Sequence, residues 1–142
     1  MNEQTIKVIL ASHGSFATSA LATLTMIAGE QPDLIALELN PGDGLDDFYK
    51  KYETIVLENP EINYLILTDI AGGTPSNAAT QLLLKYQNLQ VFSGFNLPLL
   101  LDLVTNKWQR LDEITDYISA NWSLYLTNIN TKIKQRDEQN EY

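Results

Sequence analysis

Short apolar runs alternate along the chain with longer segments in which apolar residues recur at helical spacing. The apolar runs predict buried strands at Ile6–Ala11, Leu34–Leu39, Tyr64–Leu67 and Gln90–Phe92. The helical spacing predicts helices at Phe16–Ala28, from Leu45 to Val56, from Thr74 to about Tyr86, from Pro98 onward and from Leu111 to about Trp122. Strands that alternate with helices favour an α/β fold with an open, mostly parallel sheet and helices on both faces.

Turn-forming residues separate these segments. Gly29 follows the first predicted helix, and the run Asn40-Pro41-Gly42-Asp43-Gly44 closes the second predicted strand. Thr74 is predicted to cap a helix whose first residue is Pro75. The segment from Ser123 to Lys134 fits a helix loosely, although Tyr125-Leu126-Thr127 also fits a strand, and both alternatives stay open.

Length and composition narrow the classes of protein. The 142 residues contain no linker or repeat, so we expect one domain over residues 1–134, followed by an acidic, frayed tail over residues 135–142. A net charge of −9 disfavours binding to nucleic acid or anionic lipid. The absence of cysteine excludes disulfides, thiolate metal sites and cysteine nucleophiles. No signal peptide or membrane span is evident, which predicts a cytoplasmic protein.

Candidate chemistry gathers at the predicted carboxyl ends of strands, where open parallel sheets bind ligands. His13 is the single histidine of the chain and follows the first strand, and Asp69 follows the third. In a flavodoxin-like strand order of 2-1-3-4, the first and third strands are neighbours. We therefore expect His13 and Asp69 to meet at one crevice.

Two interpretations of this pair stand side by side. A lone histidine often packs in a turn, and an aspartate after a strand often caps neighbouring amides. Alternatively, imidazole near neutrality serves as a base or nucleophile. Asp69 would then accept a hydrogen bond from one ring nitrogen of His13 and leave the other nitrogen free to attack.

The stretch from Gly72 to Asn77 is the second candidate feature. Paired glycines let backbone amides approach a ligand, and Thr74 with the start of a helix forms an anion site, although a tight turn alone would explain the same residues. No P-loop lysine follows, and no Gly-x-Gly-x-x-Gly follows the first strand, so a visiting phosphoryl group fits better than a bound nucleotide. Neither a lysine nor a carboxylate cluster suited to Mg²⁺ is evident. Transfer through a phosphohistidine, with no metal and no cofactor, is the predicted chemistry.

These residues match a known family. The matching stretches are Ser12-His13-Gly14, Pro41-Gly42, Asp69-Ile70-Ala71-Gly72-Gly73-Thr74-Pro75-Ser76-Asn77-Ala78-Ala79 and Gly94-Phe95-Asn96-Leu97-Pro98. From about Lys7 to Val104 the chain resembles the IIA component of the mannose family of the bacterial sugar phosphotransferase system. Ala71 departs from the pattern, because the family often has an aromatic residue there, on the wall that faces the partner.

The resemblance implies a phosphotransferase with a phosphohistidine intermediate. His13 matches the family's active histidine, which is phosphorylated by the carrier protein HPr, and Asp69 matches the aspartate that orients it. Gly72, Gly73 and Thr74 match the phosphate loop. The phosphoryl group would pass to a IIB component and then to a sugar that crosses the membrane through IIC and IID. The family forms homodimers that exchange a C-terminal strand, which would assign Tyr125–Ile129 to that strand.

Three alternatives compete with this interpretation. The related phosphoryl-transfer subunit of dihydroxyacetone kinase shares the fold and an early Ser-His, but the intact Gly-Gly-Thr-Pro-Ser-Asn run favours the sugar transporter. A flavodoxin-like receiver would need an acidic pair where Ala11, Ser12 and His13 stand. A serine hydrolase using Ser12, Ser15 or Ser76 would need a Gly-x-Ser-x-Gly elbow, which is absent.

Overall fold

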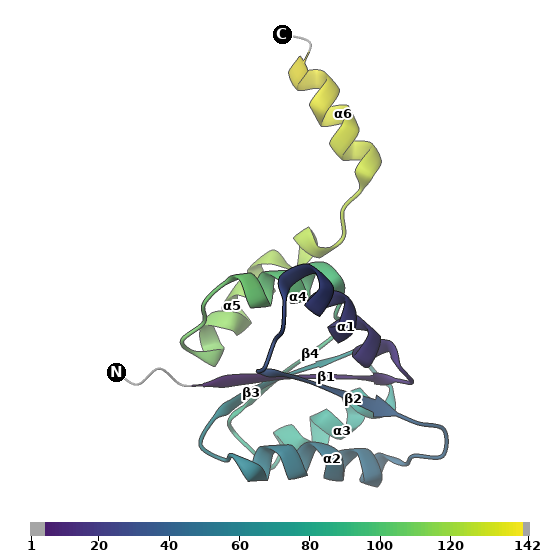
Figure 1. The fold of residues 1–142 in the computed structure, drawn as a ribbon, viewed down its shortest axis with the longest axis vertical. Helices are drawn as coiled ribbons and strands as arrows, with labels where there is room; N and C mark the ends of the chain where they lie inside the picture. The colour runs from purple at the N-terminus through teal and green to yellow at the C-terminus, as the bar shows by residue number, and fades with distance from the viewer. Residues whose placement is uncertain (1–4, 141–142) are drawn as a thin grey trace.

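A computed structural model gives the fold and describes residues 5–140. Strands and helices alternate along the chain (Figure 1). The elements are β1 (Ile6–His13), α1 (Phe16–Ala28), β2 (Leu34–Leu39), α2 (Leu45–Glu58), β3 (Asn63–Thr68), α3 (Thr74–Leu83), β4 (Leu89–Ser93), α4 (Leu97–Thr105), α5 (Leu111–Asn121), the 3₁₀ turn η1 (Trp122–Tyr125) and α6 (Ile129–Asn140).

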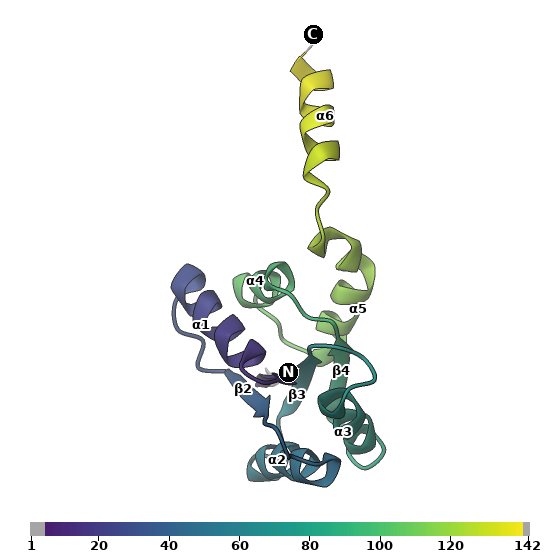
Figure 2. The ribbon, with the colours of Figure 1, turned by 90° about the vertical axis from the view of Figure 1, so that its right-hand side faces the viewer.

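The strands form one parallel sheet in the order β2-β1-β3-β4. This confirms the predicted α/β fold with the flavodoxin-like order 2-1-3-4. Helices α2 and α3 cover one face of the sheet, and α1, α4 and α5 cover the other (Figures 1 and 2). Strand β1 is central, because Ile9 lies opposite Ile35 of β2 on one side and opposite Ile66 of β3 on the other.

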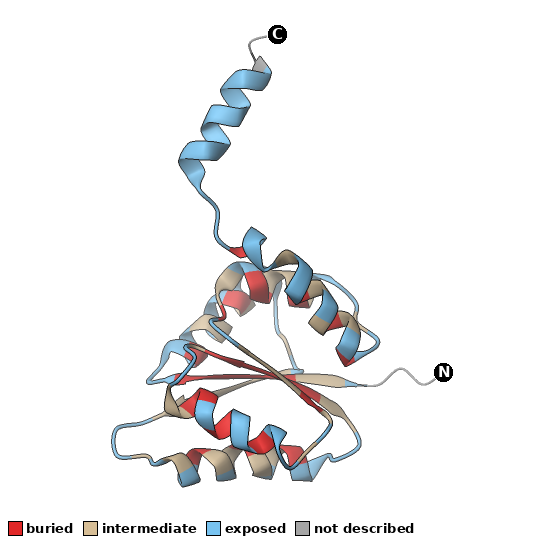
Figure 3. Ribbon diagram, turned by 180° about the vertical axis from the view of Figure 1, so that it is seen from behind, coloured by how far each residue is buried: buried red, intermediate tan, exposed pale blue. Residues whose placement is uncertain are grey.

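Burial on both faces explains why the strands are apolar runs rather than alternating ones. Side chains of β1 alternate between two cores. Val8 and Leu10 pack into the core under α1, α4 and α5, whereas Ile9 and Ala11 pack into the core under α2 and α3. Buried residues accordingly lie in the strands and on the sheet-facing sides of the helices (Figure 3).

Several element boundaries differ from the predicted ones. Strand β1 continues to His13 rather than ending at Ala11, because its backbone pairs with β2 as far as Leu39. Helix α3 begins at Thr74 itself, with Gly73 as its N-cap, so Thr74 is not the capping residue. Its regular part ends at Leu83, short of the predicted Tyr86.

The C-terminal segment consists of a 3₁₀ turn and a helix joined by a short non-helical link. Tyr125 closes the 3₁₀ turn η1, and α6 runs from Ile129 to Asn140, so the alternative of a strand at Tyr125–Thr127 is wrong for the single chain. Exchange of a strand between two chains needs a second chain and stays a prediction. Helix α6 stands away from the sheet and its covering helices (Figures 1 and 2). The predicted frayed tail is helical up to Asn140, and its last residues lie outside the described range.

Candidate functional site

The carboxyl ends of β1 and β3 bring His13 and Asp69 together. Ala11 and Thr68 are register partners, so His13 at the end of β1 lies next to Asp69, the residue that follows β3. His13 Nδ1 is 2.8 Å from Asp69 Oδ2. The backbone N–H of His13 donates to the same carboxylate oxygen at 3.0 Å. Ring and backbone of the histidine are thus both held by one side chain.

The carboxylate of Asp69 is kept ionised by its surroundings. Partial burial raises its pKa, but the backbone N–H and the ring of His13, together with the N–H of Ile70 at 2.9 Å, lower it more, and the net shift is downward. An ionised carboxylate only accepts hydrogen bonds, so Nδ1 of His13 carries the proton and donates it. The lone pair of the neutral ring therefore lies on Nε2. The His13 side chain is 51% exposed and that of Asp69 14%, so the histidine is the more accessible member of the pair.

Gly72 and Gly73 are glycines for two different reasons. Gly72 has a φ of +86°, in the left-handed region that glycine adopts without strain. Gly73 has a φ of −84°, which other residues can adopt, but a Cβ there would lie 2.6 Å from His13 Cε1 and 3.2 Å from Nε2. The backbone of the loop therefore lies directly against the Cε1–Nε2 edge of the histidine ring.

The start of α3 presents backbone amides beside this ring. The first hydrogen bond of the helix runs from the N–H of Asn77 to the carbonyl of Gly73, at 2.9 Å. The N–H groups of Gly73, Thr74 and Ser76 precede that bond and have no acceptor within the helix, and Pro75 has no N–H. Such amides and the helix dipole favour an anion. The sequence pointed to Gly72, Gly73 and Thr74, but it did not single out the Ser76 amide.

Two further polar contacts shape the turns around the site. The side-chain amide of Asn77 donates to the carbonyl of Gly72 at 3.2 Å, which ties the loop to its own helix. Ser12 is fully buried, and its Oγ accepts from the N–H of Ala17 at 2.7 Å. Ser12 therefore caps the start of α1, a structural role that does not suit a nucleophile.

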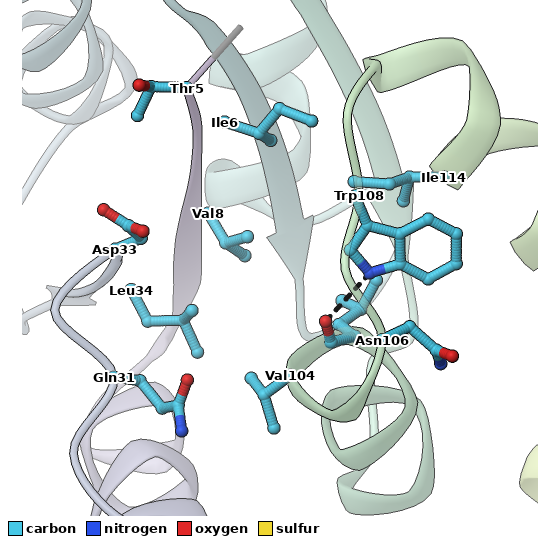
Figure 4. Close-up of a pocket in the computed structure, with 11 residues that line it drawn as sticks. Thr5, Ile6, Val8, Gln31, Asp33, Leu34, Val104, Asn106, Trp108 and Ile114 are labelled. Carbon is cyan, nitrogen blue, oxygen red and sulfur yellow. Dashed lines mark hydrogen bonds between the residues drawn. The ribbon is translucent and has the colours of Figure 1, made fainter. Parts of the chain in front are cut away.

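The hollow in Figure 4 lies at the other end of the sheet from His13. Its volume is about 400 Å³, and its wall includes Thr5, which precedes β1, Val8 of β1, Asp33 and Trp108. The indole N–H of Trp108 donates to the carbonyl of Leu103 at 2.9 Å, so it is already satisfied.

Within residues 5–140, no group of three or more acidic, histidine or cysteine side chains is placed to hold a metal ion. None of the helices described there is long and apolar enough to cross a bilayer.

The sequence of the chain matches a family of known proteins. Residues 7–118 match the family model described as the PTS system fructose IIA component. The fructose-specific EIIA component of Bacillus subtilis is 37% identical over 101 residues, which are 70% of this chain and 69% of that protein. The sorbose-specific EIIA component of Klebsiella pneumoniae is 31% identical over 116 residues, which are 81% of this chain and 85% of that protein.

Solved structures agree with the sequence matches. A phosphotransferase system component EIIA from Streptococcus agalactiae superposes with a TM-score of 0.82 at 27% identity, covering 89% of this chain and 99% of the other. A mannose/sorbose-specific IIA subunit from Enterococcus faecalis superposes with a TM-score of 0.81 at 31% identity, covering 87% and 94% of the two chains. Sequence and fold thus point to the same group of proteins.

Proposed function

Because the chain belongs to the mannose-type IIA family of the bacterial sugar phosphotransferase system, we propose that His13 accepts a phosphoryl group from phosphorylated HPr and passes it to a IIB component. IIA components are phosphotransferases and work with HPr and IIB components in general. The family match favours this role over the dihydroxyacetone kinase subunit.

The observation that carries the proposal is the hydrogen bond from His13 Nδ1 to Asp69 Oδ2, 2.8 Å long. It leaves the lone pair on Nε2, which attacks the phosphorus of the donor's phosphohistidine. The donor's P–N bond breaks, and its electron pair stays with the donor imidazole. The phosphorylated ring of His13 becomes positively charged, and the carboxylate of Asp69 stabilises that charge.

The amides at the start of α3 would bind the transferred group. We assign the phosphoryl oxygens to the N–H groups of Gly73, Thr74 and Ser76, with Gly72 supplying the left-handed turn that presents them. The hydroxyl of Thr74 is a further candidate donor. These neutral donors would bind the phosphoryl oxygens in the proposed step. Transfer of a phosphoryl group between two imidazoles needs no bound nucleotide.

The same proposal covers assembly and setting. We assign residues 1–134 to the IIA unit and residues 135–142 to an acidic tail. We also propose that the protein is a cytoplasmic homodimer whose chains exchange a C-terminal segment. Its phosphoryl group would reach the sugar carried by the IIC and IID membrane components indirectly, through IIB.

The test is phosphorylation with purified components. The protein, HPr, its phosphoenolpyruvate-dependent kinase and phosphoenolpyruvate are incubated, and the adduct is followed by mass spectrometry and by ³¹P NMR. We expect an acid-labile, base-stable adduct in the native chain and none in His13→Ala. Circular dichroism checks that this variant is folded. An adduct of equal yield in folded His13→Ala would refute the assignment.

A further inference from the structure

A buried tyrosine of α2 contacts the first turn of α3, the helix that follows the phosphate loop. Tyr52 of α2 is fully buried, and its hydroxyl donates to the carbonyl oxygen of Pro75 at 2.8 Å. Its ring packs edge-on against Phe48, with ring centroids 5.0 Å apart and planes at 90°. The hydroxyl is therefore fixed at one point beneath the first turn of α3.

The bonded carbonyl belongs to the peptide unit that joins Pro75 to Ser76. That unit is planar, and its C=O and N–H point in opposite directions. A donor that holds the carbonyl of Pro75 therefore also sets the direction of the Ser76 N–H. This N–H is one of the amides at the start of α3 that have no acceptor within the helix.

The electrostatics link Tyr52 to the histidine pair. Burial raises the pKa of Tyr52, and the negative charge of Asp69 raises it further. The hydroxyl therefore stays protonated and remains a donor at neutral pH. The contribution of Asp69 also places Tyr52 within electrostatic reach of the carboxylate that holds His13.

We propose that Tyr52 is a positioning residue of the phosphoryl site: its hydroxyl fixes the peptide unit between Pro75 and Ser76, so that the Ser76 amide meets the phosphoryl group on His13 Nε2. The inference rests on the proposed function. It adds to the site a residue that comes from α2, an element that contributes no other group to the assigned phosphate loop.

The chain offers a matched control in Tyr64. This side chain is also fully buried, and its hydroxyl also donates to backbone carbonyls, those of Ile55 at 3.2 Å and Asn59 at 3.0 Å. It lies near the start of β3, at the end of the sheet away from His13. Tyr52→Phe and Tyr64→Phe thus delete the same atom and similar hydrogen bonds, but only the first lies beneath the site.

The experiment compares the two variants in phosphoryl acceptance from phosphorylated HPr. Tyr52 bonds the backbone and not the phosphoryl group, so its loss acts by misaligning the Ser76 amide. Partial weakening of the bond from that amide to the phosphoryl group slows transfer about fivefold to tenfold. We expect Tyr52→Phe to lower kcat by about that factor and to leave KM for the donor within about twofold. Tyr64→Phe should keep the native rate, although both variants lose a similar amount of stability in urea. Equal rates for the two variants would overturn the inference.

A second measurement follows the Ser76 amide itself, in the native chain and in both variants. Phosphorylation should move the ¹⁵N-resolved amide proton of Ser76 downfield, because a charged acceptor strengthens its hydrogen bond. The shift should be smaller in Tyr52→Phe than in Tyr64→Phe. An unmoved Ser76 amide in phosphorylated native protein would also overturn the inference. A native chain that takes up no phosphoryl group would instead refute the proposed function.

Discussion

Replacing Gly73 by alanine tests the site with a single methyl group. The backbone of Gly73 has φ −84° and ψ 170°, values that alanine adopts readily, so the substitution introduces no backbone strain. The new Cβ would however lie 2.6 Å from His13 Cε1 and 3.2 Å from Nε2. Because the His13 ring is half exposed, it can rotate outward to relieve the contact. This rotation breaks its hydrogen bond to Asp69.

The expected magnitude follows from that hydrogen bond. A bond to a charged group contributes about 1.5 to 3 kcal/mol. At about 1.4 kcal/mol per tenfold change in rate, its loss slows phosphoryl acceptance by roughly 10- to 150-fold. Stability should fall by about 0.5 to 2.6 kcal/mol, because alanine at a compatible φ restricts the unfolded chain and offsets only about 0.4 to 1 kcal/mol of the lost hydrogen bond.

The assay is a single-turnover transfer from phosphorylated HPr, paired with urea unfolding of the same preparations. Gly44→Ala serves as the control. Gly44 is also a helix N-cap with extended backbone, but its Cβ would meet only Asp47 Oδ2 at 3.5 Å, an ordinary contact. We expect Gly44→Ala to transfer at the native rate. If Gly73→Ala does the same, the loop backbone does not control the histidine ring and the account of the site is wrong.

Three further substitutions probe the surrounding structure. Ser12→Ala removes the acceptor for the N–H of Ala17 and should cost about 1 kcal/mol of unfolding free energy in urea; no loss would mean that Ser12 does not cap α1. Asp69→Asn tests a pKa that is lowered in the folded state, so the carboxylate contributes stability above the unfolded value of about 3.9 and loses it as the pH falls through the lower folded pKa. The stability gap between native and variant protein should therefore shrink in acid, and a gap that is constant from about pH 6 to pH 2 would contradict this. Leu100→Ala, at a fully buried position, should cost about 2 to 5 kcal/mol, whereas Leu84→Ala, 87% exposed, should stay within about 0.5 kcal/mol; similar losses would contradict the packing.

The strand order was predicted by analogy with flavodoxin-like folds, and the meeting of His13 with Asp69 followed from that order. Apolar runs flanked by helical segments indicate a parallel sheet but leave its strand order open. Once β1 and β3 are neighbours, residues just past their carboxyl ends must lie close together. The local pattern therefore placed each residue at a strand end, and the flavodoxin-like strand order brought the two together.

Features that depend on how elements pack were not predictable. The polar residues Ser12 and His13 looked like a turn, yet the strand continues through them because backbone pairing with β2 is indifferent to side-chain polarity. The spacing of Tyr52 predicted a buried helix face, but its hydrogen bond to Pro75 depends on the seating of α2 against α3. The C-terminal helix α6 gave no clear pattern, because its residues pack into neither core.

The continuation of β1 to His13 limits how this residue can move. His13 still pairs with Leu39 of β2, and the next residue, Gly14, donates to the carbonyl of Leu39 at 2.9 Å. The Cα of His13 is therefore anchored in the central strand, and only the two side-chain torsions remain adjustable. Backbone hydrogen bonds of a sheet open less readily than those of a loop. Little backbone entropy is thus left for His13 to lose on binding, and a change in its geometry comes from the two side-chain torsions.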